Sequence, residues 1–271
     1  MDKLNVLGAG VMGRQITALF CLAGYEVFVW NRHIDEEIKG LQAKELKIAE
    51  RVLKKHGQMG NVQYVENIDA LEPLLTYEIL IEDINVKREV ISHLPYKIEK
   101  NQLITNTSSY SPIEVHDNAM GLHFFNPVYY LRFAELAYSS EELGPSIKAL
   151  IDRLKNTFGF EFIATSMNRG YIGNYLLFHE IANALKLIDE YGYKTDKIDR
   201  ILFHMGRTES LFNLIDLVGV DVCRKIILNL REKDPSLYIS PLLDVAIRKN
   251  ILGKKNNTTI RCIIDNRAVE C

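Results

Sequence analysis

The sequence predicts an α/β fold in which a doubly wound parallel sheet is followed by an all-helical C-terminal domain. Up to about Thr165, short apolar runs rich in Val, Ile and Phe alternate with helical patterns, which is typical of strands joined by crossover helices. After Asn168 the apolar residues recur at helical spacing over longer stretches. We therefore expect two domains, residues 1–166 and residues 167–271.

Eight apolar runs are candidates for strands of the sheet. They are Leu4–Leu7, Glu26–Trp30, Gln63–Val65, Ile79–Glu82, Leu103–Thr105, Gly121–Phe125, Leu131–Leu136 and Glu161–Thr165. In the second domain the pattern predicts one long helix that contains Ile172 and Ile188, and then further helices. These are expected at Ile198–Met205, Leu211–Val218, Val222–Leu230 and Leu242–Ile251.

The composition is that of an ordinary globular protein, and it argues against several classes of function. Hydrophobic residues make up 47% of the chain and charged residues 25%, with 33 Lys and Arg against 35 Asp and Glu. This balance favours no nucleic-acid partner, and no apolar run reaches the ~18 residues that would suggest a membrane span. The four cysteines have no metal-type spacing and are interpreted as buried or free thiols. This spacing also leads us to expect no metal site. Because the start lacks a signal-peptide pattern, we expect a cytoplasmic protein.

A glycine-rich segment follows the first predicted strand and leads into a predicted helix. It reads Gly8-Ala9-Gly10-Val11-Met12-Gly13. Glycines here permit a tight turn and let backbone N–H groups approach a pyrophosphate at the helix N-terminus. The segment therefore predicts a Rossmann-type, dinucleotide-binding first domain, and a purely structural turn is the alternative. The residues expected at the cofactor are Gly8, Gly10, Val11, Met12 and Gly13.

The residues after the second predicted strand bear on the choice of cofactor. In many dinucleotide-binding sheets an acidic residue at this place holds the ribose of NAD. Here Asn31 and Arg32 stand there instead. Asn31 can still hydrogen-bond a ribose hydroxyl and Arg32 can pair with a 2′-phosphate, so NAD and NADP are both candidate cofactors. The alternative is that Arg32 is only a solvated side chain.

Polar residues gather in the second half of the predicted sheet. His123 lies in one apolar run and Glu135 in the next, so the two side chains can meet if the runs pair. A carboxylate beside the imidazole would fix its tautomer and stabilise its protonated form, as suits a base that takes a hydroxyl proton during hydride transfer. Asn106 and Ser108 follow a predicted strand, at the end where ligands collect in open α/β sheets. A core histidine and simple capping residues are the alternatives.

Together, four segments resemble the 3-hydroxyacyl-CoA dehydrogenase family in its short form, which includes 3-hydroxybutyryl-CoA dehydrogenases. The segments are GAGVMG, NTSSY, GLHFFNP and NRGYIGNYLL, and the likeness extends over nearly the whole chain. The resemblance implies an acyl-CoA substrate and a helical domain that forms a homodimer. It also implies roles for single residues: His123 as the acid/base, Glu135 as its partner, Ser108 as a donor to the substrate oxygen, Asn174 as a positioning residue, and Glu82, Lys87 and Asn106 on the cofactor side.

The sequence departs from the family pattern at a few places. Only Asp83-Ile84-Asn85 separates Val86 from the predicted strand that ends at Glu82, where the family has a longer acidic segment. We therefore expect a shortened loop there. Residues 256–271 also lack the family's usual C-terminal ending.

The leading hypothesis is an oxidoreductase that transfers a hydride between a nicotinamide cofactor and C3 of a 3-hydroxyacyl or 3-oxoacyl thioester. One alternative is a β-hydroxyacid dehydrogenase that acts on a small free acid. That chemistry needs a lysine base, and the segment 173–180 offers none. A second alternative is a catalytically inactive, dehydrogenase-like binding protein, which loss of the polar residues would have favoured.

Overall fold

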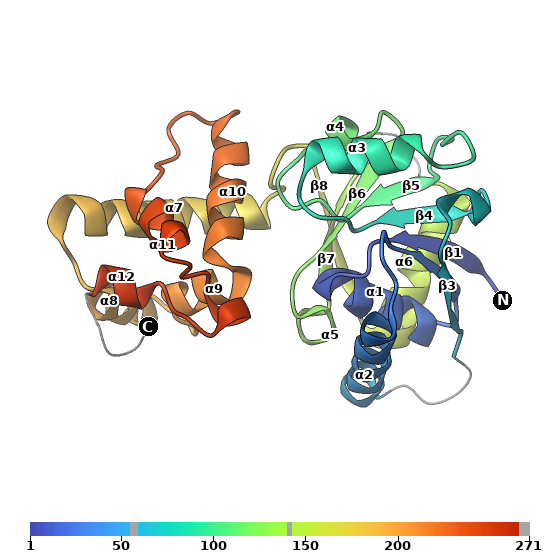
Figure 1. Ribbon diagram of the computed structural model, residues 1–271, viewed down its shortest axis with the longest axis horizontal. Coiled ribbons are helices and arrows are strands. Elements are labelled where there is room, and N and C mark those ends of the chain that lie inside the picture. The colour runs from blue at the N-terminus through green and yellow to red at the C-terminus, as the bar shows by residue number, and fades with distance from the viewer. Residues whose placement is uncertain (55–58, 140–142, 266–271) are drawn as a thin grey trace. The chain divides into compact units, whose positions relative to one another are not determined.

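The chain folds into two compact units, Met1–Tyr171 and Ile172–Cys271. The computed structural model describes residues 1–54, 59–139 and 143–265 (Figure 1).

The first unit is built on an eight-stranded sheet with the order β3-β2-β1-β4-β5-β6-β7-β8. Its neighbouring strands are parallel, except that β6 and β7 run antiparallel. Chain order runs outward from β1 in both directions, so the sheet is doubly wound, as predicted. The strands are β1 Lys3–Leu7, β2 Glu26–Trp30, β3 Val62–Val65, β4 Leu75–Glu78, β5 Leu103–Thr105, β6 Ala119–Phe124, β7 Phe133–Ala137 and β8 Glu161–Thr165.

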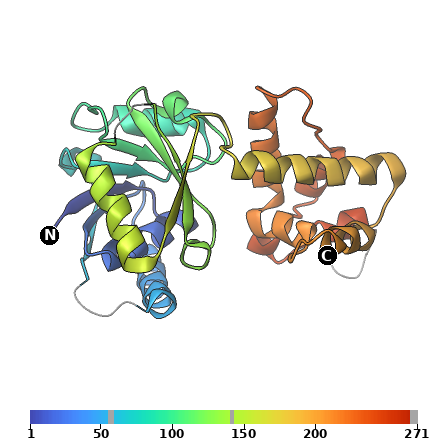
Figure 2. The ribbon, with the colours of Figure 1, turned by 180° about the vertical axis from the view of Figure 1, so that it is seen from behind.

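Helices cover both faces of this sheet. The helices are α1 Val11–Leu22, α2 Glu36–Leu53, α3 Ile84–Ser92, α4 Pro112–Val115, α5 Val128–Leu131 and α6 Pro145–Phe158, with a short 3-10 turn at Ile68–Ala70. Leu19 of α1 and Leu150 of α6 share one apolar core with Leu122 of β6, and Figure 2 shows α6 along this face. Val90 of α3 and Val115 of α4 belong to the core on the opposite face. The sheet is therefore buried on both sides, which is the usual environment of parallel strands.

One predicted strand was placed wrongly. Sequence alternation favoured Ile79–Glu82, but the strand is Leu75–Glu78, which pairs with β1 in the register Leu4↔Leu75 to Leu7↔Glu78. Thr76 and Glu78 are polar and fully buried in it, which is why the segment did not read as a core strand. The Thr76 hydroxyl is 2.9 Å from the hydroxyl of Tyr96, and Glu78 pairs with Lys87.

The position of β4 also changes the segment that follows it. Because the strand ends at Glu78, residues 79–83 connect it to α3, which begins at Ile84. Asp83 ends this segment as the N-cap of α3, where its carboxylate accepts a hydrogen bond of 3.0 Å from the Asn85 N–H. Glu82 thus lies in the connection between β4 and α3 and not at the end of a strand.

The second unit is all-helical in its described residues, as predicted. Its helices are α7 Gly173–Tyr191, α8 Thr195–His204, α9 Leu211–Val218, α10 Val220–Arg231, α11 Pro241–Arg248 and α12 Arg261–Ile264, with a 3-10 turn at Lys254–Asn256. They enclose a separate apolar core to which Phe178, Leu185 and Ile227 belong. No helix in the described residues is both long and apolar enough to cross a membrane.

The cysteines only partly match their interpretation as thiols. Cys21 and Cys223 are buried free thiols, and burial raises the pKa of Cys21 to about 11. Cys262, by contrast, is disulfide-bonded, so the interpretation is wrong for this residue. Cys271 lies outside the described residues.

Candidate active site

The glycine-rich turn joins the end of β1 to the start of α1. A Cβ atom at Gly8 would lie 2.4 Å from the Ile79 carbonyl oxygen, and one at Gly13 would lie 2.2 Å from the Gly8 oxygen. The close packing therefore leaves no room for a side chain at either position. Gly10 differs, because nothing lies within 4 Å of its Cβ position, and as the N-cap of α1 it supplies no side-chain hydrogen bond.

This turn fits the pyrophosphate of a dinucleotide. The first N–H groups of a helix have no partner within the helix and attract an anion. The open space at Gly10 lets a phosphate approach them. Of the other two predicted residues on this turn, Val11 is exposed and Met12 is half-buried.

Asn31 holds the same turn from the end of β2. Its side-chain oxygen accepts a hydrogen bond of 3.2 Å from the Ala9 N–H, and its amide nitrogen donates one of 2.8 Å to the His33 carbonyl. The amide therefore links the glycine-rich turn to the second strand. Arg32 beside it is exposed to solvent.

A second turn, residues 106–109, follows β5 and is organised by Glu82. One oxygen of the Glu82 carboxylate, Oε1, accepts four hydrogen bonds from this turn. The donors are the Thr107 hydroxyl at 2.7 Å, the Ser108 N–H at 2.9 Å, the Ser109 N–H at 2.7 Å and the Ser109 hydroxyl at 2.8 Å. Ser108 is therefore held by its backbone in a rigid turn at the carboxyl end of a strand.

Beneath Glu82 lies a buried group of charges. The ammonium of Lys87 is 2.7 Å from Glu78 Oε1 and 3.4 Å from Glu82 Oε2, and the side chains of Lys87 and Glu78 are 1% and 0% exposed. Burial alone would lower the pKa of Lys87, but the two carboxylates raise it, so the ammonium stays charged. Burial opposes the charge of Glu82 as well, yet Lys87 and the hydroxyls of Thr107 and Ser109 lower its pKa.

Asn106 connects this turn to β6. Its side-chain oxygen accepts hydrogen bonds from the Phe124 N–H at 2.9 Å and from the Tyr77 hydroxyl at 3.3 Å. Its own N–H donates to the Glu78 carbonyl at 2.9 Å. Asn106 thus fixes the carboxyl ends of β4, β5 and β6 against one another.

His123 and Glu135 face each other across the antiparallel pair that β6 and β7 form. The register of β6 and β7 places them directly opposite, and His123 Nδ1 lies 3.0 Å from Glu135 Oε2. Both are buried, with 4% and 3% of their surface exposed. Because the carboxylate of Glu135, on the neighbouring strand β7, contacts Nδ1, Nε2 is the ring nitrogen that can exchange a proton with a ligand.

Gln15 is a residue of the site region that sequence reasoning missed. It lies on α1, where its amide nitrogen donates to Asn126 Oδ1 at 3.0 Å and its oxygen accepts from the Val128 N–H at 2.9 Å. It therefore ties the helix of the glycine-rich turn to the turn after β6. Glu78 was also missed, and its charge inside a central strand was the available clue.

The remaining predicted residue, Asn174, belongs to the second unit. It lies in the first turn of α7 and is 6% exposed. The other candidates, from Gly8 to Glu135, all belong to the first unit. No cluster of metal ligands occurs among the described residues.

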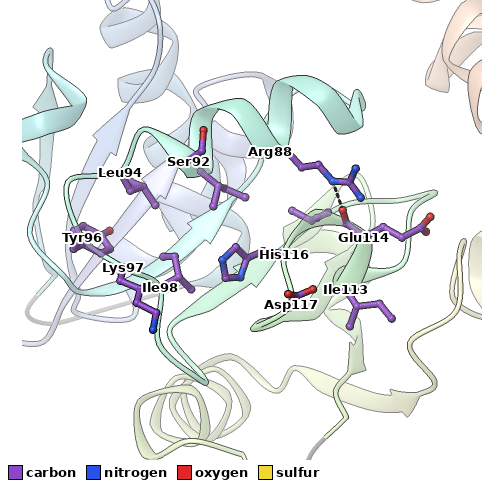
Figure 3. Close-up of a pocket in the computed structure, with 12 residues that line it drawn as sticks. Arg88, Ser92, Leu94, Tyr96, Lys97, Ile98, Ile113, Glu114, His116 and Asp117 are labelled. Atoms are coloured by element: carbon purple, nitrogen blue, oxygen red, sulfur yellow. Dashed lines mark hydrogen bonds between the residues drawn. The ribbon is translucent and has the colours of Figure 1, made fainter.

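A depression of about 480 Å³ lies elsewhere on the first unit, beside α3 and α4 (Figure 3). Arg88, Lys97 and His116 line it together with Glu114 and Asp117. Arg88 already has a partner within the protein, since its Nε donates a hydrogen bond of 2.7 Å to the Glu114 carbonyl. None of the predicted site residues lines this depression, so it does not compete with the site at the strand ends.

Comparisons with known proteins identify the family of the chain. Residues 3–157 match the family described as 3-hydroxyacyl-CoA dehydrogenase, NAD binding domain, and residues 170–261 match its C-terminal domain. The chain is 26% identical to the mitochondrial hydroxyacyl-coenzyme A dehydrogenase of Sus scrofa, with 94% of this chain and 89% of the relative covered. It is also 26% identical to a 3-hydroxybutyryl-CoA dehydrogenase of Clostridioides difficile, with 93% and 96% covered.

A solved structure shows the same fold over nearly the full length. The crystal structure of FadB2 from M. tuberculosis superimposes with a TM-score of 0.78 at 24% identity, and 96% of this chain and 98% of that chain are covered. The two family matches together extend through both units, and the first of them is an NAD-binding domain. The chain therefore belongs to the 3-hydroxyacyl-CoA dehydrogenase family.

Proposed function

We propose that this protein interconverts 3-hydroxyacyl and 3-oxoacyl thioesters of coenzyme A by hydride transfer at C3. The observation that carries the proposal is the contact between His123 Nδ1 and Glu135 Oε2, 3.0 Å apart and buried in the sheet. A carboxylate hydrogen-bonded to Nδ1 fixes the tautomer of the imidazole and leaves Nε2 as the nitrogen that faces the substrate. The same pair would have little use in a protein that only bound a dinucleotide.

His123 acts as the general acid/base of the proposed reaction. During oxidation Nε2 accepts the proton of the C3 hydroxyl as the carbonyl forms, and Glu135 stabilises the resulting imidazolium. During reduction the imidazolium returns the proton to the C3 oxygen. The nicotinamide, when bound, accepts or supplies the hydride at C3.

The other predicted site residues have supporting roles in this proposal. The Ser108 hydroxyl donates a hydrogen bond to the substrate oxygen, and Asn174 positions the ligand from the helical unit. Glu82 and Lys87 contribute to the cofactor side by holding the turn 106–109, and Asn106 holds the strand ends together. The hydrogen bonds that hold the turn 106–109 support the role of Ser108, because a group that binds substrate must be held in a constant position.

We further propose that NAD and NADP are both usable as cofactors, with a modest preference for NADP. Gly8, Gly10, Val11, Met12 and Gly13 would hold the pyrophosphate, with Asn31 and Arg32 near the adenosine ribose. Asn31 carries no charge that would repel a 2′-phosphate, and Arg32 is exposed and adjacent to it. The working protein is proposed to be a cytoplasmic homodimer.

The experiment that tests the main proposal is a spectrophotometric assay. Purified protein is mixed with acetoacetyl-CoA and either NADH or NADPH, and absorbance of the reduced nicotinamide is followed over time. We expect oxidation of both cofactors that depends on acetoacetyl-CoA. Free acetoacetate is the matched control, and reduction of the free acid in preference to the thioester would contradict the proposed substrate class.

A further inference from the structure

An aromatic side chain that sequence reasoning did not single out lies flat against His123. The ring of Tyr171 is 5.0 Å from the imidazole between centroids, and the two planes differ by 6°. Phe125 approaches the imidazole as well, at 4.5 Å and 63°. Within the described part of the chain, His123 therefore has Glu135 as its hydrogen-bonding partner and Phe125 and Tyr171 as aromatic neighbours.

The backbone takes an unfavourable conformation to place Tyr171 there. Its φ is +51°, in the left-handed region that residues with a Cβ seldom adopt, and Gly170 before it has a φ of +74°. Such backbone conformations persist where the surroundings enforce them, and they cluster at functional sites. Here the preceding residues are anchored: Arg169 Nε donates to a carboxylate oxygen of Glu114 at 2.7 Å, and the Ser111 hydroxyl donates to the Met167 carbonyl.

The sheet also makes room for this ring. Gly121 lies two residues before His123 on β6, so the two residues face the same side of the sheet. A Cβ atom at Gly121 would be 2.5 Å from the Tyr171 hydroxyl oxygen and 2.7 Å from a ring carbon. A side chain at position 121 would therefore displace the phenol from the imidazole.

Hydrogen bonding by the phenol does not explain its position. Tyr171 is 4% exposed, and its hydroxyl has no hydrogen-bond partner among the described residues. Burial, followed by the nearby carboxylates of Glu82, Glu135 and Glu78, raises its pKa well above the ordinary value, so it stays neutral. The contact that remains is that of the ring with the imidazole.

We propose that Tyr171 is a positioning residue that fixes the plane of the His123 imidazole, a role that rests on the proposed acid/base function of His123. One hydrogen bond to Glu135 directs Nδ1 but leaves the ring torsion broad, because the χ2 torsion of histidine has no sharp staggered minima. A parallel ring in contact with one face narrows that torsion. Together the two contacts hold Nε2 in a constant direction.

Substitutions that separate the ring from the hydroxyl test this role. Tyr171→Leu removes the flat contact, whereas Tyr171→Phe keeps it. We expect kcat for acetoacetyl-CoA reduction to fall about 10- to 100-fold in Tyr171→Leu, with KM values for both substrates within about twofold, because a small misplacement of a catalytic group is costly. Tyr171→Phe should restore kcat to within about threefold of the original chain, as the ring is retained.

Tyr25 supplies a matched control. It is also 4% exposed in the first unit, its hydroxyl likewise lacks a partner among the described residues, and its ring contacts Arg153 and not His123. Tyr25→Leu should leave kcat unchanged. If Tyr171→Leu does not fold, Tyr171→Met replaces it, since methionine fills a similar space without a flat face.

A readout that does not need activity separates this inference from the proposed function. The NMR resonances of the carbon-bound protons on the His123 ring are assigned with the His123→Ala variant. Their chemical shifts are then compared among the Tyr171 variants. We expect their resonances to move in Tyr171→Leu, because the ring current of Tyr171 is lost, and to stay near their original positions in Tyr171→Phe. Unmoved resonances in Tyr171→Leu would overturn the inference.

The kinetic outcomes are equally distinct. Near-normal kcat in a folded Tyr171→Leu variant, or an equal loss in Tyr171→Phe, would overturn the positioning role of the ring. Absence of acetoacetyl-CoA reduction by the original chain would contradict the proposed function alone, and the NMR comparison would then decide whether the ring of Tyr171 contacts the imidazole.

Discussion

At the scale of single residues, the proposed chemistry depends on two side chains that are close in space because of strand register. His123 and Glu135 are twelve positions apart in the chain and directly opposite on β6 and β7. Side chains on directly opposed residues of an antiparallel pair lie on the same face, near enough to interact. A shift of one residue in this register would turn the carboxylate to the other face, so the pair also depends on the turn between the strands.

The first prediction concerns His123. His123→Ala should lower kcat for acetoacetyl-CoA reduction by roughly 10²- to 10⁴-fold, which is the usual contribution of a general acid/base. Dinucleotide binding should stay near normal, because the turn from Gly8 to Gly13 is untouched. Kinetics combined with a fluorescence titration of the nicotinamide cofactor checks both points.

His93→Ala is the control for this prediction, since His93 is an exposed residue that follows α3. It should leave both kcat and cofactor affinity unchanged. A folded His123→Ala variant with near-normal turnover would contradict the assignment of the acid/base.

The second prediction concerns Glu135. Glu135→Gln keeps the shape of the side chain but removes the negative charge beside Nδ1, which stabilises the imidazolium that takes part in proton transfer. At a fixed pH, kcat for acetoacetyl-CoA reduction should therefore fall by about 10- to 100-fold, a part of the usual contribution of a general acid/base. Steady-state kinetics measures the change.

Glu161→Gln is the control, because Glu161 is an exposed carboxylate on the neighbouring strand β8. Its kcat should match that of the original chain. An unchanged kcat in a folded Glu135→Gln variant would argue against the electrostatic role of Glu135.

At the scale of elements, the site is assembled where β1, β4, β5 and β6 end at the same edge of the sheet. Glu82, in the connection after β4, organises the turn after β5 through four hydrogen bonds. Lys87, on α3, forms ion pairs with both Glu78 and Glu82 and offsets one of their two negative charges. The geometry of the turn is therefore coupled to a buried ion pair, and its rigidity has an identifiable source.

The third prediction tests that coupling. Lys87→Met should lower the free energy of unfolding of the first unit by about 3–5 kcal/mol, because two carboxylates remain buried without a counter-charge. Trp30 is the only tryptophan and lies on β2, so its fluorescence during urea unfolding reports on this unit. Lys47→Met, at an exposed position of α2, is the control and should change stability little. A loss in Lys87→Met no larger than in the control would contradict the account of the buried charges.

The fourth prediction concerns the end of β2. Arg32→Ala should lower the ratio of kcat/KM for NADPH to that for NADH, because the charge-assisted contact with a 2′-phosphate is lost. Asn31→Asp should lower the same ratio further by repelling the phosphate. Arg200→Ala, at an exposed arginine of α8, is the control. An unchanged ratio in Arg32→Ala would show that Arg32 is only a solvated side chain.

At the scale of the whole molecule, the helical unit has its own core but also exposes large apolar side chains. On α7, Leu176, Leu187 and Tyr191 are exposed, and on α8 so are Ile201 and Phe203. Extended apolar exposure marks interaction surfaces. A symmetric pairing of two copies through this unit would bury such residues.

The fifth prediction is therefore a homodimer formed through the helical unit. Light scattering at micromolar concentration should give about twice the chain mass, and Leu176→Glu should shift the protein toward monomer by placing a charge in the interface. Ile81→Glu is the control, since Ile81 is an exposed apolar residue of the first unit. A monomer in the original chain, or an unchanged dimer in Leu176→Glu, would contradict this interface.

The sequence by itself determined the fold class, the glycine-rich turn and most helices and strands, because these depend on local periodicity and on residues that are neighbours in the chain. Helix α9 and strands β2, β5 and β8 have the predicted bounds. The tertiary structure alone decided that β4 carries the buried Glu78, that Lys87 balances it, and that Tyr171 lies on His123. The physical reason is that a buried charge or a strained backbone is stabilised by partners far away in the chain. A local pattern of apolar and polar residues does not contain those partners.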